Sequence, residues 1–137
     1  MKLDFDSYFM NIAEAVKLRS PDIIKVGAVL VSSRLNRVLS TGMNGTPKGF
    51  DDTKINWANR EQVSKYIIHA ETNALLYADS KFEDSKLYTT RSPCRSCIKL
   101  LAAAGVREVI YGEPHKDLEL VAMLCLDFDI ELRQTAL

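Results

Sequence analysis

The order of apolar runs along this 137-residue chain predicts an α/β fold, a three-layer α/β/α sandwich with a mixed five-stranded sheet. Strands that alternate with helices indicate a sheet whose later strands run parallel. Two consecutive strands joined by a short turn indicate an antiparallel hairpin, which makes the sheet mixed. The length suits one hydrophobic core and the sequence contains no repeat, so we expect residues 1–137 to form a single domain.

The first half of the chain predicts one helix, the hairpin and a long connection. Apolar residues recur at helical spacing over 5–16 and predict an N-terminal helix. The β-branched run at 26–31 predicts a buried strand, and residues 37–42 form its predicted hairpin partner. The glycine-punctuated stretch 43–49 predicts a loop, and we expect the polar segment 51–60 to be mobile.

The second half of the chain alternates between helical and strand patterns. Pro93 suits a helix start, because the first turn does not need its missing N–H, and Gly105 suits the helix end. In order, the predicted elements are a helix over 72–78, a strand over 86–90, a helix over 94–104, a strand over 108–111, a helix over 118–126 and a short strand over 128–132.

Composition and charge exclude several classes of protein. Eighteen basic and 18 acidic residues give zero net charge, so a long nucleic acid is not an expected partner. Residues 1–6 are acidic and lack a long apolar run, so we expect no signal peptide, and no stretch approaches the length of a membrane span. Three cysteines, two of them in a metal-type pattern, argue against a disulfide scaffold and indicate a cytoplasmic setting.

Two short motifs carry the residue types of a metal site. Residues 69–71 read His-Ala-Glu and residues 93–97 read Pro-Cys-Arg-Ser-Cys, a combination typical of zinc deaminases. Zinc prefers sulfur and imidazole ligands, which His69, Cys94 and Cys97 would supply while leaving a fourth position for water. The two cysteines are three residues apart, so they share one face of a helix. The sequence therefore predicts one catalytic Zn²⁺ held by these three side chains.

Each motif lies at the start of a predicted helix, where the helix dipole favours thiolate over thiol. Glu71 is left without a ligand role, and a free carboxylate beside an activated water is what a proton shuttle requires. Plainer interpretations are a redox pair for the two cysteines, a packed core histidine, or a structural zinc site, which needs a fourth ligand. Cys125 lies in an apolar helical run and is expected to be buried and inert, whereas His115 follows Pro114 in a predicted loop and is expected on the surface.

From about Phe5 to Tyr111 the chain resembles the deoxycytidylate (dCMP) deaminase family, within the cytidine-deaminase superfamily. The zinc motif identifies only the superfamily, whereas the Asn-Gly-x-Pro-Lys-Gly loop at 44–49 points to dCMP deaminases, and the small phage-type members are closest in length. The most specific segments are 8–10, 19–20, 26–29, 44–45, 47–49, 69–74 and 87–90 leading to Pro93, Cys94 and Cys97.

The resemblance implies hydrolysis of dCMP to dUMP and ammonia, supplying dUMP for thymidylate synthesis. A metal-activated water attacks C4 of the base, and Glu71 carries protons to ring N3 and to the leaving amine. It further implies that the Ala70 N–H holds the ring carbonyl and that Asn44 holds the sugar, although an Asn-Gly turn tip is the plain alternative. Tyr111 is placed beside the nucleotide pocket, and a half-buried strand aromatic is an equal alternative. The candidates for the phosphate are Lys48, the N–H groups of Gly45 and Thr46, Arg19 and Arg91.

Departures from the family pattern lead to further expectations. Met43 stands where the family commonly has Tyr, which bears on ring packing or an effector contact. Residues 50–68 contain no Cys or His, so we expect a single zinc per chain. The resemblance implies a homo-oligomer, a hexamer in many members, activated by dCTP and inhibited by dTTP, with Mg²⁺ accompanying a triphosphate effector. A phage-encoded member would act in the host cytoplasm.

Two other functions compete with this interpretation. A tRNA adenosine deaminase or a free-base deaminase would share the fold, but a tRNA enzyme should be more basic. A non-catalytic, zinc-stabilised binding module would have no use for Glu71.

Overall fold

A five-stranded sheet with the strand order β2-β1-β3-β4-β5 forms the middle of the molecule in a computed structural model that describes residues 1–79 and 84–135. Strand β1 pairs antiparallel with both β2 and β3, whereas β3–β4 and β4–β5 are parallel. The predicted mixed sheet and its N-terminal hairpin are therefore confirmed. The strands are β1 (Gly27–Ser32), β2 (Arg37–Met43), β3 (Ser85–Arg91), β4 (Val106–Glu113) and β5 (Glu131–Gln134).

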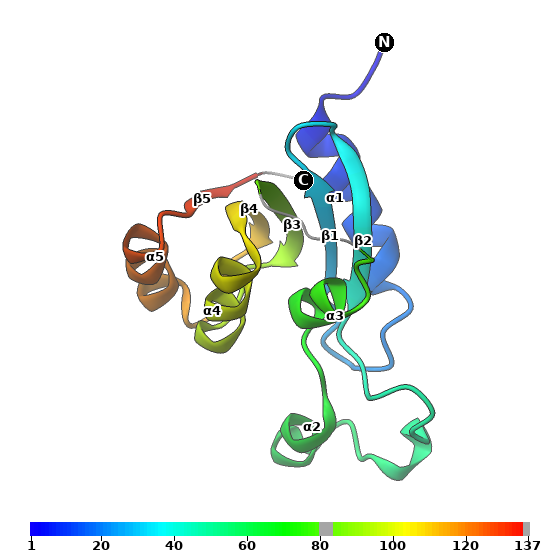
Figure 1. The fold of residues 1–137 in the computed structure, drawn as a ribbon. Coiled ribbons are helices and arrows are strands. Elements are labelled where there is room, and N and C mark those ends of the chain that lie inside the picture. The colour runs from blue at the N-terminus through cyan, green and yellow to red at the C-terminus, as the bar shows by residue number, and fades with distance from the viewer. Residues whose placement is uncertain (80–83, 136–137) are drawn as a thin grey trace.

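Helices cover both faces of the sheet and complete the predicted three layers (Figure 1). Helix α1 (Phe5–Lys17) packs on β1 and β3 from one side. Helices α3 (Ala70–Leu76), α4 (Arg95–Ala104) and α5 (Leu118–Asp127) form the layer on the other side. Helix α2 (Arg60–Tyr66) lies apart from these layers, below α3 in Figure 1. Within the described residues no helix is both long and apolar enough to span a bilayer.

Strand β1 shows why two helical layers are needed. Val29 and Val31 belong to the core cluster under α1, whereas Ala28 and Leu30 belong to the cluster under α3 and α4. All four side chains are fully buried, which is why the strand reads as a continuous apolar run rather than an alternating one.

The polar segment 51–60, whose mobility stays a prediction, contains a short helical turn and leads into a further helix. A 3₁₀ turn, η1 (Asp52–Lys54), is followed by α2, whose N-terminus is capped by the Asn59 side chain. The sequence pattern missed this helix because Val63 is its only buried residue, so no helical apolar periodicity is present. At the C-terminus β5 begins at Glu131, three residues later than the strand predicted over 128–132.

A polar cluster anchors α1 to the sheet. The Tyr88 hydroxyl donates to Asp6 Oδ1 at 2.6 Å, and Arg133 donates to Oδ2 and Oδ1 of the same carboxylate at 2.6 and 3.0 Å. The hydrogen bonds from Arg133 lower the pKa of Asp6 to about 2, despite partial burial. The Asp6–Arg133 ion pair lies on the α1 face of the sheet, away from the metal-type residues on α3 and α4.

Candidate active site

Three metal-type ligands meet where two helices begin. His69 is the N-cap of α3, Cys94 is the N-cap of α4, and Cys97 lies in the first turn of α4. Nδ1 of His69 is 3.2 Å from Sγ of Cys97 and 3.3 Å from Sγ of Cys94. A tetrahedral zinc with ordinary bond lengths would separate such nitrogen and sulfur atoms by roughly 3.6 Å, so the three side chains fit the metal with little adjustment.

Hydrogen bonds among these ligands favour one thiolate before any metal arrives. The pKa of Cys94 is lowered, first by a hydrogen bond from the Cys97 thiol and then by contacts with the His69 ring and Ser96. The pKa of Cys97 is raised, first by that same hydrogen bond and then by burial. The pKa of His69 is raised because its ring hydrogen-bonds to Cys94. The helix N-terminus adds to this preference for negative charge at Cys94.

Glu71 lies in the first turn of α3, buried and next to the ligand cluster. Its side chain is 4% exposed, and burial raises the pKa of its carboxyl group. The Thr89 hydroxyl is 3.1 Å from Oε1 of Glu71 and 2.7 Å from the carbonyl oxygen of Arg91. Thr89 can therefore donate to an ionised Glu71, or accept from a protonated Glu71 while donating to Arg91. A carboxyl group with a raised pKa, supported in both protonation states, suits proton transfer.

A pocket of about 350 Å³ opens over this cluster. Its walls include His69, Glu71 and Cys94, together with the cationic side chains of Arg60, Arg91 and Lys116. The volume is that of a small-molecule site. The arrangement can bind a cation at one end, move a proton beside it and attract an anionic group elsewhere in the pocket.

Some of the substrate-binding residues predicted from the sequence lie in this pocket, and others, all among the described residues, do not. Asn44, Ala70 and Arg91 line it. Those outside its lining are Arg19, Gly45, Thr46, Lys48 and Tyr111.

The residues outside the pocket are engaged elsewhere or lie apart from it. The N–H of Gly45 donates to the Ile68 carbonyl at 3.0 Å, so it is not free for a phosphate. Thr46, whose N–H was the second candidate, does not line the pocket, and its hydroxyl donates to an Asp52 carboxylate oxygen at 2.6 Å. Arg19 lines a separate hollow. The remaining two lie apart for simpler reasons, since Lys48 is exposed and Tyr111 is buried within β4.

Sequence reasoning missed Arg60, Lys116, Asp22 and His115, which all line the pocket. His115 lies in a loop, as expected, but its side chain is half-buried in the pocket wall rather than fully exposed. Its position just after β4 was a usable signal, since ligands bind beyond the carboxyl ends of parallel strands. The expectation that Cys125 is buried is confirmed, at 2% exposure.

Comparisons with known proteins agree with this geometry. The family model for the cytidine and deoxycytidylate deaminase zinc-binding region matches residues 3–113. The chain is 41% identical over 123 residues to the deoxycytidylate deaminase of Mycobacterium phage D29, covering 79% of this chain and 94% of that protein. It is 34% identical over 121 residues to a probable deoxycytidylate deaminase of Drosophila melanogaster, covering 80% of this chain but only 59% of that protein.

Among solved structures, the fold is similar to the dCMP deaminase from the cyanophage S-TIM5 in complex with dCMP and dUMP. The TM-score is 0.83 at 27% sequence identity, and the match covers 98% of this chain and 99% of the cyanophage chain. The similarity therefore extends over the whole sheet and both helical layers.

Proposed function

The chain belongs to the cytidine and deoxycytidylate deaminase family, and on that premise we propose that it hydrolyses dCMP to dUMP and ammonia. The observation that carries the proposal is a single pocket that joins the His69, Cys94 and Cys97 cluster to a buried Glu71 and to three cationic side chains. A cytosine base suits the metal end and a phosphate suits the cationic side chains. The phage D29 relative and the cyanophage structure, whose names state this substrate, support the choice of dCMP.

His69, Cys94 and Cys97 would hold the zinc, which when bound lowers the pKa of a water molecule and so activates it for attack. Glu71 then accepts the proton released by that water and delivers it to N3 of the cytosine ring. Glu71 then takes a second proton, from the hydroxyl group now attached to C4, and passes it to the amine as the C4–N bond breaks, so that ammonia leaves and the carbonyl of dUMP forms. Thr89 keeps Glu71 oriented in both protonation states, because its hydroxyl both donates and accepts.

The cationic residues in the pocket are the basis for choosing a nucleotide over a nucleoside. Of the phosphate candidates taken from the sequence, Arg91 is the one in the pocket lining, and Arg60 and Lys116 join it there. We assign the phosphate to these three, in place of Lys48, Arg19 and the N–H groups of Gly45 and Thr46. Asn44 would accept from a sugar hydroxyl, and the Ala70 N–H would hold the ring carbonyl, as the family resemblance implies.

The proposal extends to regulation and assembly. A homo-oligomer controlled by dCTP and dTTP, with Mg²⁺ on the triphosphate, would be a cytoplasmic source of dUMP for thymidylate synthesis. An effector needs a site outside the catalytic pocket, and a second hollow of about 370 Å³ includes Arg19, Met43 and Tyr77 among its lining residues. Arg19 would meet a phosphate there, which gives this residue a role that the catalytic pocket does not. Titrating the initial rate with dCTP and dTTP, for the wild type and Arg19→Ala, tests this part.

The test of the main proposal is ammonia release by the zinc-loaded protein from dCMP, cytidine, cytosine and an adenosine-containing tRNA stem-loop. We expect turnover of dCMP well above the other three. Activity on the stem-loop without activity on dCMP would instead support a tRNA deaminase, and activity on none of them would support a binding module. Glu71→Gln is the matched control: it should retain zinc while turnover falls at least about a hundredfold, the usual effect of losing a proton-transfer group.

A further inference from the structure

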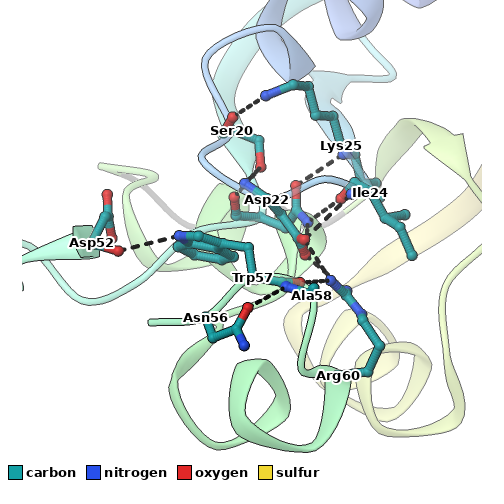
Figure 2. Close-up of polar contacts among 11 residues, drawn as sticks. Ser20, Asp22, Ile24, Lys25, Asp52, Asn56, Trp57, Ala58 and Arg60 are labelled. Carbon is teal, nitrogen blue, oxygen red and sulfur yellow. Dashed lines mark hydrogen bonds and ion pairs between the residues drawn. The ribbon is translucent and has the colours of Figure 1, made fainter. Parts of the chain in front are cut away.

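Asp22 contacts two pocket-lining side chains from the loop between α1 and β1. The carboxylate is buried, with 2% of the side chain exposed. Its Oδ1 accepts from Arg60 Nη1 at 2.7 Å, and its Oδ2 accepts from Arg60 Nη2 at 3.0 Å and from Asn44 Nδ2 at 3.3 Å. Figure 2 shows Asp22 at the centre of this network with Arg60 beside it. Burial opposes ionisation, but the hydrogen bonds from Arg60 and the Ile24 backbone outweigh it and lower the pKa of Asp22.

The network determines how Asn44 can meet a ligand. Its Nδ2 group donates to the Ile24 carbonyl at 2.7 Å and to Asp22, which uses both of its protons. Its Oδ1 accepts from the Val26 N–H at 2.9 Å and retains one unused lone pair. The amide therefore cannot flip without losing these bonds, and it offers the pocket an acceptor only. A ligand must bring a donor, such as a hydroxyl group, to this position.

The same carboxylate determines where Arg60 points. Two parallel hydrogen bonds to Asp22, and a third from Nη1 to the Trp57 carbonyl at 3.0 Å, fix the plane of the guanidinium. N–H groups on Nη2 and Nε remain, on a side chain that is 47% exposed and lines the pocket. A guanidinium held in this way loses little further entropy when it binds an anion. Helix α2, which supplies Arg60, is thereby tied to the pocket.

We propose that Asp22 is a positioning residue that selects the substrate: it makes Asn44 an obligate acceptor and aims Arg60 at an anionic group, so the pocket prefers a ligand carrying a hydroxyl and a phosphate. The inference rests on the proposed function, because dCMP carries both groups on one sugar. Asp22 itself touches neither the reacting atoms nor the metal ligands. Its effect should therefore appear in substrate binding rather than in the chemical step.

The variant that tests this is Asp22→Asn, with Asp6→Asn as its matched control. Asp6 also accepts two hydrogen bonds from one arginine and a third from another side chain, but it lies outside the pocket. For the zinc-loaded Asp22→Asn protein we expect KM for dCMP to rise roughly tenfold to hundredfold, the effect of losing a charged hydrogen bond, while kcat changes little. Asp6→Asn should lower the melting temperature and leave KM unchanged.

Calorimetric measurement of product binding separates the contact of Asp22 with Arg60 from its contact with Asn44. Asp22→Asn should weaken dUMP binding strongly and deoxyuridine binding less, because only dUMP brings an anion to Arg60. In an Arg60→Met background, Asp22→Asn should weaken dUMP binding much less than in the wild type, because the guanidinium that Asp22 positions for the anion is already absent.

The outcomes of these experiments are distinguishable. If the wild type does not turn over dCMP, the proposed function fails. If it does, but Asp22→Asn binds dUMP as tightly as Asp6→Asn, the positioning role alone is overturned. Should Asp22→Asn not fold, Arg60→Lys still decides, because it keeps the charge and loses the two-point pairing. An unchanged KM for Arg60→Lys refutes the inference, and a KM raised like that of Arg60→Met supports it.

Discussion

Gly42 lies where α3 crosses β2 with no room for a side chain. A Cβ at this position would be 2.4 Å from the Ala70 carbonyl oxygen and 2.4 Å from the Ala74 nitrogen, both backbone atoms of α3. Normal contacts are about 1 Å longer, so Gly42→Ala should push the helix off the strand by that amount. Overpacking of this kind costs about 1–3 kcal/mol of the free energy of unfolding.

The displacement should also reach the chemistry, because the N-terminal end of α3 carries His69 and Glu71. A misplacement of about 1 Å at a reacting group costs on the order of a hundredfold in rate. We therefore expect Gly42→Ala to lower kcat about a hundredfold, to weaken zinc retention and to reduce stability.

Gly27→Ala is the matched control for this experiment. A Cβ at Gly27 would be 2.1 Å from the Ala13 carbonyl oxygen of α1, an overlap at least as severe on the other face of the sheet. None of the residues of α1, all of which the structure describes, lines the pocket. Urea unfolding should show both variants destabilised, while kcat per zinc-loaded, folded molecule should fall only for Gly42→Ala. Similar kcat values for the two variants would refute the claim that α3 transmits the displacement to the site.

Three other measurements test the remaining contacts. Cys97→Ala should lose bound zinc by atomic absorption and unfold at a lower temperature, because metal binding is coupled to folding, and full zinc retention would contradict the ligand assignment. Thr89→Val should lower kcat about tenfold with KM for dCMP little changed, since it loses only the hydroxyl that supports Glu71, and a change confined to KM would count against that role. The Asp6–Arg133 pair should add to the free energy of unfolding above about pH 4 and lose this contribution as pH falls to about 2, because the pKa of Asp6 is lowered to about 2 in the folded state. Because 32% of the Asp6 side chain is exposed, we expect the pair to contribute about 1 kcal/mol to the free energy of unfolding. The measurement is the stability of Asp6→Asn against pH, which should fall less steeply than that of the wild type between about pH 4 and about pH 2. An unchanged pH dependence would show that the pair adds nothing.

The sheet and the metal cluster were predictable because their signals are local. Strand β1 is buried on both faces, so its sequence is a continuous apolar run. Such a run identifies a buried strand without any knowledge of the elements that pack against it. Cys94 and Cys97 are placed on one helix turn by their spacing alone, and Gly105 ends that helix in the left-handed conformation, with φ of 99°. The position of His69 and Glu71 at the start of α3 was predictable in the same way, from the helical pattern of the residues that follow them.

The pocket walls were not predictable because their signals are not local. Helix α2 buries one side chain, Val63, so nothing in its periodicity marks it as a helix. His115 enters the pocket wall because its N–H donates to Ser92 at 2.6 Å and its Nδ1 accepts from the Asp117 N–H at 3.0 Å, contacts that a loop sequence does not reveal. Residues 45–48 have types that suit a phosphate, but the Gly45 N–H donates to the Ile68 carbonyl, a contact between distant residues that the sequence does not reveal.

The two halves of the pocket therefore differ in how sequence change can affect them. The metal end depends on residues a few positions apart on two helices, so almost any substitution there removes the reaction. The recognition end joins Asp22 to Asn44 across 22 residues and to Arg60 across 38 residues, through side chains on loops and on a helix outside the main layers. Loops and a marginally packed helix tolerate substitution better than the buried sheet, because fewer contacts depend on them. Changes in substrate preference should accordingly arise in the two connections on either side of the β1–β2 hairpin, residues 18–26 and 44–60, without loss of zinc. A chimaera that exchanges these two connections with those of a homologous deaminase of different preference, and keeps β1 and β2, should alter KM ratios between substrates while leaving metal content intact. Loss of zinc in such a chimaera would mean that the two ends are not separable.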